Sequence, residues 1–248
     1  MTADALPCTN SLMTKTALVT GAGSGVGQAV ALQLAREGWN VGLIGRRPDA
    51  LQQTVKLAEE LGTRMLAVPC DVSDAEPLAK AAATVAAKFG VIEVLVAAAG
   101  MNIPRRSWEV LTVEDYRTVI EANLNGVFNS IHAVLPGMRK AGRGTIVTIV
   151  SDAGMIANAK AGAAYCASKF GVRGLSQSLN TEERANGIRA TAIFPGDINT
   201  PILDKRPVPP PPEARLKMLQ AEDLAACVML AVNLPDRAVV EEMLIRPR

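Results

Sequence analysis

The sequence predicts an α/β fold, a doubly wound parallel sheet with helices on both faces, and three observations predict it. Short, continuously apolar runs alternate with longer Ala- and Leu-rich segments from residue 15 onward. Strands that are apolar throughout are typical of a parallel sheet that is covered on both faces. A glycine-rich segment joins the first run to the first helix. No repeat or linker divides the 248 residues, so we expect one domain over 14–248 after a flexible tail over 1–13.

The elements follow from these patterns in chain order. The expected strands cover residues 16–20, 40–45, 64–72, 92–100, 144–151, 188–196 and 243–247. The expected helices cover 25–38, 49–62, the segment from Ser73 to about Gly90, 112–140, 163–186 and one segment after the Pro-rich loop at 206–215. Gly38 marks the end of the first helix, and Ser73 with Glu76 forms an S-x-x-E capping box. Together these elements describe a Rossmann-type domain, with a stiff substrate loop at about 200–216.

Composition narrows the class of protein. Apolar residues make up 49% of the chain and aromatic residues only 3%, so the core is built from Ala, Val, Leu and Ile. The balance of 26 basic and 24 acidic residues gives no broad footprint for nucleic acid or an anionic membrane. The first residues lack the pattern of a secretory signal, no apolar stretch is long enough to span a membrane, and Met13 is an alternative start of translation. We therefore expect a cytoplasmic protein.

The cysteines and the histidine give no site of their own. Cys8, Cys70, Cys166 and Cys227 are scattered with no C-x-x-C spacing, so both a disulfide framework and a metal site are disfavoured and no metal is expected. His132 is the only histidine, and we interpret it as a structural or interfacial residue.

The segment TGAGSGVG at 20–27 predicts a dinucleotide site. Glycines let the backbone turn sharply and approach a pyrophosphate, whose charge then meets the positive end of the helix that follows. The pattern is T-G-x-x-x-G-x-G rather than G-x-G-x-x-G, since residue 26 is Val. The alternative is a glycine-rich turn without a ligand. The predicted contacts are Gly21, Gly23, Ser24, Gly25, Val26 and Gly27.

The end of the second strand bears on which dinucleotide is bound. An NAD site usually has an acidic residue there, which accepts from the ribose 2′-hydroxyl and repels a 2′-phosphate. Here Gly45 leaves space, and Arg46 and Arg47 follow. A guanidinium offers a forked donor to phosphate, so the sequence favours NADP over NAD. Asp71 ends the third strand, where it either faces the adenine edge or caps its own loop.

Tyr165 and Lys169 stand four residues apart on an expected helix. Taken alone, this spacing is an ordinary pair of helical neighbours. Four other motifs, however, precede it in order, namely the glycine loop, CDV at 70–72, EAN at 121–123 and IVS at 149–151. In this order the motifs resemble the short-chain dehydrogenase/reductase family, in its compact branch, over about residues 15–247.

The resemblance implies a catalytic set and its chemistry. The set is Asn123, Ser151, Tyr165 and Lys169, with Tyr165 as the acid/base. Ser151 would hydrogen-bond the substrate oxygen, Lys169 would hold the nicotinamide ribose, and Asn123 would hold a water that relays protons. Lowering a tyrosine pKa from 10 by ~3 units takes ~4 kcal/mol, for which a neighbouring ammonium is a source. The further cofactor contacts implied are Val72, Ala98, Ala99, Gly100, Tyr165, Lys169, Pro195, Gly196, Ile198 and Thr200.

The chain departs from the family pattern in two places. The usual N-N-A-G after the fourth strand is AAAG at 97–100, and Asn102 is a candidate substitute for the lost amide. Ser151 and Tyr165 lie 14 residues apart, one more than is usual, and we expect a bulge to absorb the extra residue. We expect a partly apolar substrate pocket without a clear anion clamp and interpret Arg105 and Arg106 as solvated loop charges. The alternative is that these two arginines bind an anionic group. The expected lining of the pocket is 101–106, Asp152, Met155, Ile156 and the Pro-rich loop.

Three functions compete at this point. The first is reversible hydride transfer between NADP(H) and a small carbonyl or secondary alcohol. The second is a non-catalytic dinucleotide sensor, which a broken catalytic set would favour. The third is an epimerase or dehydratase, for which the residues after Gly196 leave little room. The resemblance also implies a homotetramer or homodimer through the helices at 112–140 and 163–186, which are rich in small and apolar residues.

Overall fold

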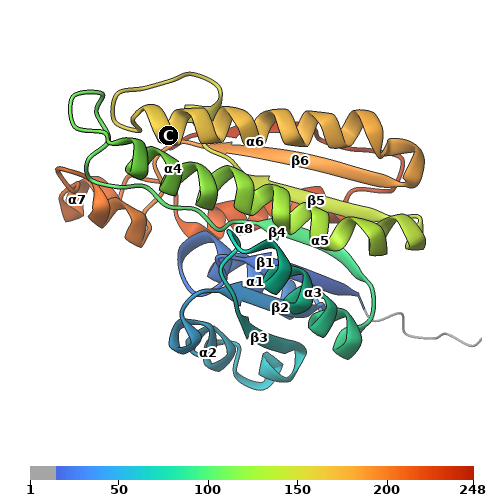
Figure 1. Cartoon of the computed structure of the whole chain (residues 1–248). Coiled ribbons are helices and arrows are strands. Elements are labelled where there is room, and N and C mark those ends of the chain that lie inside the picture. The colour runs from blue at the N-terminus through green and yellow to red at the C-terminus, as the bar shows by residue number, and fades with distance from the viewer. Residues whose placement is uncertain (1–14) are drawn as a thin grey trace, which may run out of the picture.

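A computed structural model describes residues 15–248, and the predicted tail over 1–13 lies outside them. Its centre is one parallel sheet of seven strands in the order β3-β2-β1-β4-β5-β6-β7 (Figure 1). The strands are β1 Thr16–Thr20, β2 Asn40–Gly45, β3 Met65–Pro69, β4 Ile92–Ala97, β5 Gly144–Ile149, β6 Ile188–Pro195 and β7 Glu242–Ile245. The strand order reverses between β1 and β4, so the predicted doubly wound, Rossmann-type fold is confirmed.

Helices cover both faces of this sheet. They are α1 Gly25–Arg36, α2 Pro48–Leu57, α3 Ala75–Phe89, α4 Val113–Ile120, α5 Gly126–Ala141, α6 Ala163–Glu182, α7 Pro212–Arg215 and α8 Ala221–Asn233. Two separate cores result, one with α1, α2 and α8 and the other with α3, α5 and α6. Among residues 15–248, no helix is long and apolar enough to cross a membrane.

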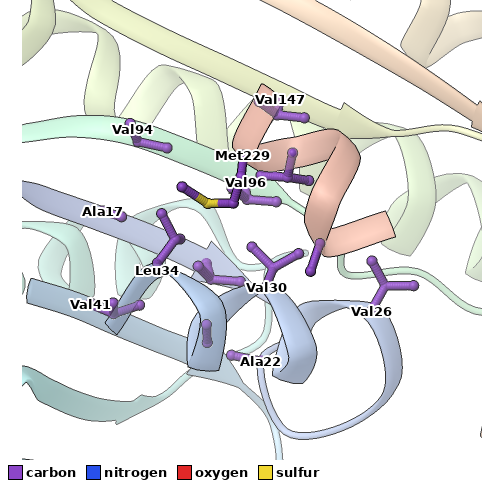
Figure 2. Packing of buried hydrophobic residues seen from close by; sticks show 14 of the residues in the cluster. Ala17, Ala22, Val26, Val30, Leu34, Val41, Val94, Val96, Val147 and Met229 are labelled. Atoms are coloured by element: carbon purple, nitrogen blue, oxygen red, sulfur yellow. The ribbon is translucent and has the colours of Figure 1, made fainter. Parts of the chain in front are cut away.

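The central strands are buried because helices cover both faces of the sheet, and their side chains alternate between the two cores. In β1, Ala17 and Val19 pack with α1 and α8, whereas Leu18 packs with the opposite helices. Figure 2 shows the first core, where Leu34 of α1 and Met229 of α8 lie over the strands. Small aliphatic side chains fill this space, in agreement with the low aromatic content, and each buried one contributes about 1.5–3 kcal/mol.

Several predicted boundaries are wrong by a few residues. The helix expected over 49–62 stops at Leu57, because Glu59 has a φ of 52°, and a 3₁₀ segment at Glu59–Arg64 follows. The helix expected over 163–186 ends at Glu182 and is followed by a 3₁₀ turn. The strands expected to reach residues 72, 100 and 151 end at Pro69, Ala97 and Ile149. Pro69 and Ala97 pair with the last residues of β2 and β1, whereas β6 continues past the partner of Ile149.

The predicted capping box at Ser73 is also wrong. Helix α3 begins at Ala75 with Asp74 at its cap, and that cap makes no side-chain hydrogen bond. The Ser73 backbone N–H instead donates to Asp71 Oδ1 at 3.0 Å, so Asp71 closes the loop. Asp71 Oδ1 therefore caps its own loop, which is one of the two roles expected for this residue.

The long helix expected over 112–140 is divided in the middle. Thr112 caps α4 by accepting from the Asp115 N–H, and a widened π-helical turn at Glu121–Asn125 connects α4 to α5. Such a turn shifts the side chains that follow it to a different face of the helix. The turn carries Asn123, whose side chain is fully buried.

Candidate active site

A cavity of about 1070 Å³ opens at the carboxyl ends of the strands. It extends from the glycine loop after β1, across the point where the strand order reverses, to the loops that follow β4, β5 and β6. Open α/β sheets bind ligands at this kind of position. All of the predicted site residues except Asn123 line the cavity, and Asn123 lies directly behind its wall.

The glycine loop closes tightly against the sheet. Gly21 and Gly25 have φ values of 68° and 54°, which favour glycine. A Cβ on Gly27 would lie 2.4 Å from the Gly21 carbonyl oxygen, and one on Gly21 would lie 2.9 Å from residues 98 and 99. Ser24 stands at the start of α1 without a side-chain cap bond, and the first residues of this helix line the cavity. These features fit a pyrophosphate at the end of α1.

The end of β2 supplies two cations to the same side of the cavity. Arg46 and Arg47 line it, and Arg47 directly precedes α2. Arg46 Nη1 lies 3.7 Å from Asp71 Oδ2, and its side chain is 63% exposed. This loose pair leaves the guanidinium donors of Arg46 accessible to a ligand. Val72 also lines the cavity beside Asp71.

The segment AAAG is braced by Thr20, and the predicted substitution by Asn102 is wrong. Thr20 Oγ1 accepts from the Ala99 N–H at 3.1 Å, which connects the end of β1 to the end of β4. Asn102 Nδ2 instead donates to the Ala161 carbonyl at 2.9 Å. Ala98, Ala99 and Gly100 line the cavity. Thr20, the first residue of the glycine motif, was the feature of the sequence that could have indicated this brace.

Asn123 holds the backbone beside Gly100. Its Oδ1 accepts from the Met101 N–H at 2.7 Å, and its Nδ2 donates to the Met101 carbonyl at 2.9 Å and to Ser168 Oγ at 3.3 Å. A Cβ on Gly100 would lie 3.4 Å from Asn123 Oδ1 and 3.7 Å from Lys169 Nζ. The glycine therefore leaves a small space between these two polar groups.

Ser151, Tyr165 and Lys169 meet at the centre of the cavity. Lys169 Nζ donates to the Ile149 carbonyl at 2.9 Å and lies 5.5 Å from the centre of the Tyr165 ring. Ser151 Oγ donates to Asp152 Oδ1 at 3.3 Å and accepts from the Ala153 N–H at 3.2 Å. Ser151 and Tyr165 are connected by a 3₁₀ turn at Asp152–Gly154 and an exposed loop, in which the extra residue lies.

Burial shifts the pKa values of the tyrosine and the lysine in opposite directions. It raises the Tyr165 pKa to about 12, although the Ser151 hydroxyl acts to lower it, and the Asp152 charge raises it further. It lowers the Lys169 pKa to about 8. Without a ligand, burial thus disfavours both the phenolate and the ammonium. Additional positive charge in the cavity would favour the phenolate.

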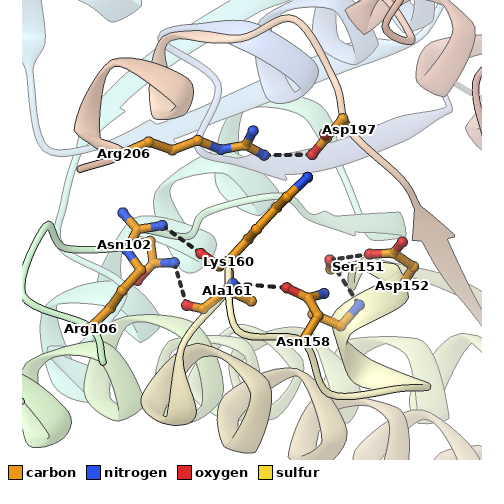
Figure 3. A network of polar contacts seen from close by, with 10 residues as sticks. Asn102, Arg106, Ser151, Asp152, Asn158, Lys160, Ala161, Asp197 and Arg206 are labelled. Carbon is orange, nitrogen blue, oxygen red and sulfur yellow. Dashed lines mark hydrogen bonds and ion pairs between the residues drawn. The ribbon is translucent and has the colours of Figure 1, made fainter. Parts of the chain in front are cut away.

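The substrate side of the cavity contains a residue whose role we predicted wrongly. Arg106 was expected to be a solvated loop charge, yet it is only 7% exposed and lines the cavity. It donates to the carbonyls of Ile103, Lys160 and Lys205 at 2.6, 3.1 and 2.8 Å, and Figure 3 shows the bond to Lys160. Arg105 fits the expectation, since it is exposed and pairs with Asp115. No short motif around Arg106 indicated its burial.

The remaining expectations for this side are met in part. Pro195, Gly196, Ile198 and Thr200 line the cavity, and Arg206 forms an ion pair with Asp197 at its edge. Met155 packs toward the second core instead, Ile156 is 70% exposed, and residues 103–105 and 207–215 do not line the cavity. Within residues 15–248, no group of His, Cys, Asp or Glu residues is arranged to hold a metal.

The comparisons with known proteins agree with this geometry. The model of the short chain dehydrogenase family matches residues 15–208. The chain belongs to the short-chain dehydrogenase family. As a member, it is an oxidoreductase of the NAD(P)-binding kind.

Three relatives illustrate the range of this family. The glycine betaine reductase ATRR of Emericella nidulans is 36% identical over 94% of the chain, which spans only 19% of that protein. The D-beta-hydroxybutyrate dehydrogenase of Rhizobium meliloti is 34% identical over 88% of the chain and 83% of the relative. An alcohol dehydrogenase of the archaeon Thermococcus sibiricus, solved with 5-hydroxy-NADP, has a TM-score of 0.84, 29% identity and coverage of 94% and 97% of the two chains.

Proposed function

We propose that this enzyme transfers hydride reversibly between NADP(H) and a small carbonyl or secondary alcohol, with Tyr165 as the acid/base. The observation that carries the proposal is the meeting of Ser151, Tyr165 and Lys169 in the middle of one cavity, next to a glycine loop that fits a pyrophosphate. The names of two relatives, a hydroxybutyrate dehydrogenase and an alcohol dehydrogenase, support a hydroxyl or carbonyl substrate.

Each residue of the site has a proposed task. The bound nicotinamide cofactor supplies the hydride acceptor or donor. The Tyr165 hydroxyl gives a proton to the carbonyl oxygen during reduction and takes it back during alcohol oxidation. Ser151 Oγ donates a hydrogen bond to the same oxygen, once it has turned from Asp152. Lys169 holds the ribose hydroxyls, and the space beside Gly100, Asn123 and Lys169 takes a relay water.

The shifted pKa values give this proposal a quantitative requirement. A tyrosine that works near neutral pH needs a pKa several units below about 12, at about 1.4 kcal/mol for each unit. Lys169, Arg106 and the charge of an oxidised nicotinamide ring are the sources of positive charge near the phenol. The reaction is therefore expected to depend on cofactor binding before proton transfer.

The preference for NADP is proposed from the end of β2. A Cβ on Gly45 would contact only Leu51, at 3.2 Å, so no carboxylate blocks a 2′-phosphate there. Arg46 and Arg47 stand beside this space at the start of α2. Asp71 Oδ2 competes for Arg46 at 3.7 Å, which weakens the preference without abolishing it. The complex of the Thermococcus relative with 5-hydroxy-NADP is consistent with this choice.

We further propose one domain over 14–248 with a substrate loop at about 200–216, and a homotetramer or homodimer in the cytoplasm. Apolar side chains on three helices support the assembly, since Val113, Tyr116, Phe128 and Phe170 are between 40 and 68% exposed. His132 stacks on Phe128 with ring centres 5.8 Å apart, as an interfacial histidine would. Light scattering that shows only a 26.1 kDa particle at micromolar concentration would contradict the assembly.

The deciding experiment is a screen of small ketones and secondary alcohols with NADP(H) and NAD(H) in turn. We expect net oxidation or reduction of free cofactor with at least one substrate, and faster turnover with NADP(H). If the protein binds NADP(H) but turns over nothing in either direction, the sensor interpretation replaces the enzyme. If a substrate is converted without net change in the cofactor, the epimerase interpretation replaces hydride transfer between free molecules.

A further inference from the structure

Arg106 is a buried cation that has no acidic partner among residues 15–248. Its three hydrogen bonds all go to backbone carbonyls, and it forms no ion pair. A guanidinium carries five N–H donors. One N–H on each terminal nitrogen therefore has no partner. Buried charges are normally paired, so an anion at this position would lower the free energy of the site.

The surroundings of Arg106 are positive as well. The charged side chains that line the cavity from the loops at 101–112, 152–162 and 197–206 are the cations Arg106, Lys160, Lys205 and Arg206 and the carboxylates Asp152 and Asp197. Asp197 pairs with Arg206, and Asp152 accepts from Ser151 until that hydroxyl turns to the substrate, so four cations face at most one unpaired carboxylate. Burial and the charge of Arg206 lower the Arg106 pKa, as expected for a cation with too little negative charge nearby.

Lys160 adds a second cation without a partner. Its ammonium forms no hydrogen bond or ion pair with the described residues, while its backbone carbonyl accepts from Arg106. Figure 3 shows its side chain extending from the 155–162 loop across the cavity, toward Asp197 and Arg206. The Arg106 side chain is thus hydrogen-bonded to the Lys160 backbone, and both residues line the cavity.

These cations lie on the substrate side rather than the nucleotide side. Arg106 is close enough to Tyr165 for the two charges to interact, and it is hydrogen-bonded to the loops at 155–162 and 201–206. The glycine loop and Arg46, which fit the phosphates, line the same cavity from the loops after β1 and β2. Arg106 belongs to the loop after β4 and interacts with Tyr165, so its free donors are on the side of the reacting group.

We propose that the substrate carries a carboxylate, which the free N–H groups of Arg106 bind while Lys160 supplies a second positive charge. This rests on the proposed function, and it replaces the expectation of an apolar pocket without an anion clamp. The substrate class is then a small oxo acid or hydroxy acid, whose carbonyl or hydroxyl carbon faces Tyr165. One charge-assisted hydrogen bond supplies about 10- to 150-fold in affinity.

The test compares acids with their neutral esters on the wild-type enzyme. Pyruvate, acetoacetate and levulinate differ in the spacing between carbonyl and carboxylate, and each has a methyl ester of similar size. We expect kcat/KM for at least one acid to exceed that of its ester by at least about tenfold. KM for that acid should rise with salt, because screening weakens charge pairing, while KM for the ester stays level. Esters that react as well as the acids in all three pairs would overturn the proposal.

Variants assign the effect to residues. Arg106→Gln should lower kcat/KM for the acid by about 10- to 100-fold and change it for the ester by less than about threefold. Since this change removes three loop contacts, Lys160→Gln serves as a milder variant, with an expected loss of about two- to tenfold for the acid only. Lys140→Gln, on the exposed end of α5, is the matched control. Equal losses for acid and ester in Arg106→Gln would mean a purely structural Arg106 and overturn its role.

The two proposals fail in distinguishable ways. If neutral ketones are turned over and no acid is preferred, hydride transfer stands and the carboxylate site is wrong. If nothing is turned over with either cofactor, the proposed function is wrong, and a binding measurement then tests the carboxylate site. Calorimetry with the three acids and their methyl esters, at saturating NADP, should then detect at least one acid without its ester, and only with Arg106 intact. Equal binding of acid and ester in every pair, or no binding of any of them, overturns the site.

Discussion

The two ends of the cavity are built by different means. The nucleotide end consists of backbone, since glycines at positive φ or in close contact set its shape and the first residues of helix α1 line it. The substrate end consists of loops that side chains hold together, above all Arg106, whose partners lie 3, 54 and 99 residues away. A backbone cradle suits a ligand shared by a whole family, whereas contacts between side chains can differ from one substrate to the next.

Where the two ends meet, we expect the largest effect of a single change. Tyr165→Phe keeps the ring and its packing but removes the hydroxyl that would move the proton. Turnover should fall by about 10²- to 10⁴-fold, with NADP(H) affinity nearly unchanged. Steady-state rates and fluorescence titration of NADPH measure the two quantities. More than about a tenth of wild-type turnover would contradict acid/base work by Tyr165.

A change at the nucleotide end should affect binding and stability together. In Gly27→Ala, the new Cβ would lie 2.4 Å from the Gly21 carbonyl oxygen, so the loop has to open. We expect a cost of about 1–3 kcal/mol in the free energy of unfolding and at least about tenfold weaker NADP(H) binding. Gly137→Ala is the control, because nothing lies within 4 Å of its Cβ position on α5. A Gly27→Ala enzyme with wild-type affinity would show that the cradle is not in contact with the cofactor.

Arg46→Ala tests the one part of the nucleotide end that depends on a side chain. Wild type should favour NADP(H) over NAD(H) by at least about tenfold in kcat/KM, and the variant should lose most of that margin. Rates with NAD(H) serve as the internal control, since they should change little. A wild-type enzyme that favours NAD(H) would overturn the NADP assignment.

The smallest effect on activity is expected at Glu183, which lies between α6 and β6 and does not line the cavity. Glu183 accepts from Arg139 Nε at 2.9 Å and from Asn186 Nδ2 at 2.8 Å, which together lower its pKa to about 2. Because the folded pKa lies below the unfolded value of about 4.5, the stability that Glu183 contributes is present above pH 4.5 and is lost as pH falls toward 2.

Glu183→Gln should therefore cost about 1–3 kcal/mol near neutral pH and leave kcat/KM unchanged. Its free energy of unfolding should approach that of wild type in acid, as Glu183 becomes protonated. Denaturant melts at several pH values measure this. A difference between the two proteins that stays constant down to the lowest pH would contradict the role given to the Glu183 charge.

The sequence predicted the backbone end of the cavity well because few residues can make it. A glycine that must adopt positive φ, or approach another chain segment closely, is visible in the sequence, as Gly21 and Gly27 were. The positions of the strands along the chain followed from apolar runs, and the residues expected at the centre, Ser151 and Tyr165, line one cavity. Helix ends were predicted less well, since a single backbone angle at Glu59 decided one of them.

The side-chain end was predicted poorly for a physical reason. Arg106 is buried because three loops, distant in sequence, offer carbonyls to it at once, and no local pattern contains that information. The brace at Ala99 was assigned to a nearby Asn102, yet it comes from Thr20, which is 79 residues away. The capping box at Ser73 failed because Asp71, two residues earlier, takes the Ser73 backbone N–H.

The three acceptors of Arg106 also limit how this enzyme can change. The loops after β4, β5 and β6 are joined through one guanidinium, so none of them can be replaced from a relative without supplying a carbonyl at the same point. Grafting a single loop to alter specificity would leave donors of a buried cation unsatisfied. The three loops are expected to be inherited as a set, and directed evolution of new substrates should succeed more often when libraries vary them jointly.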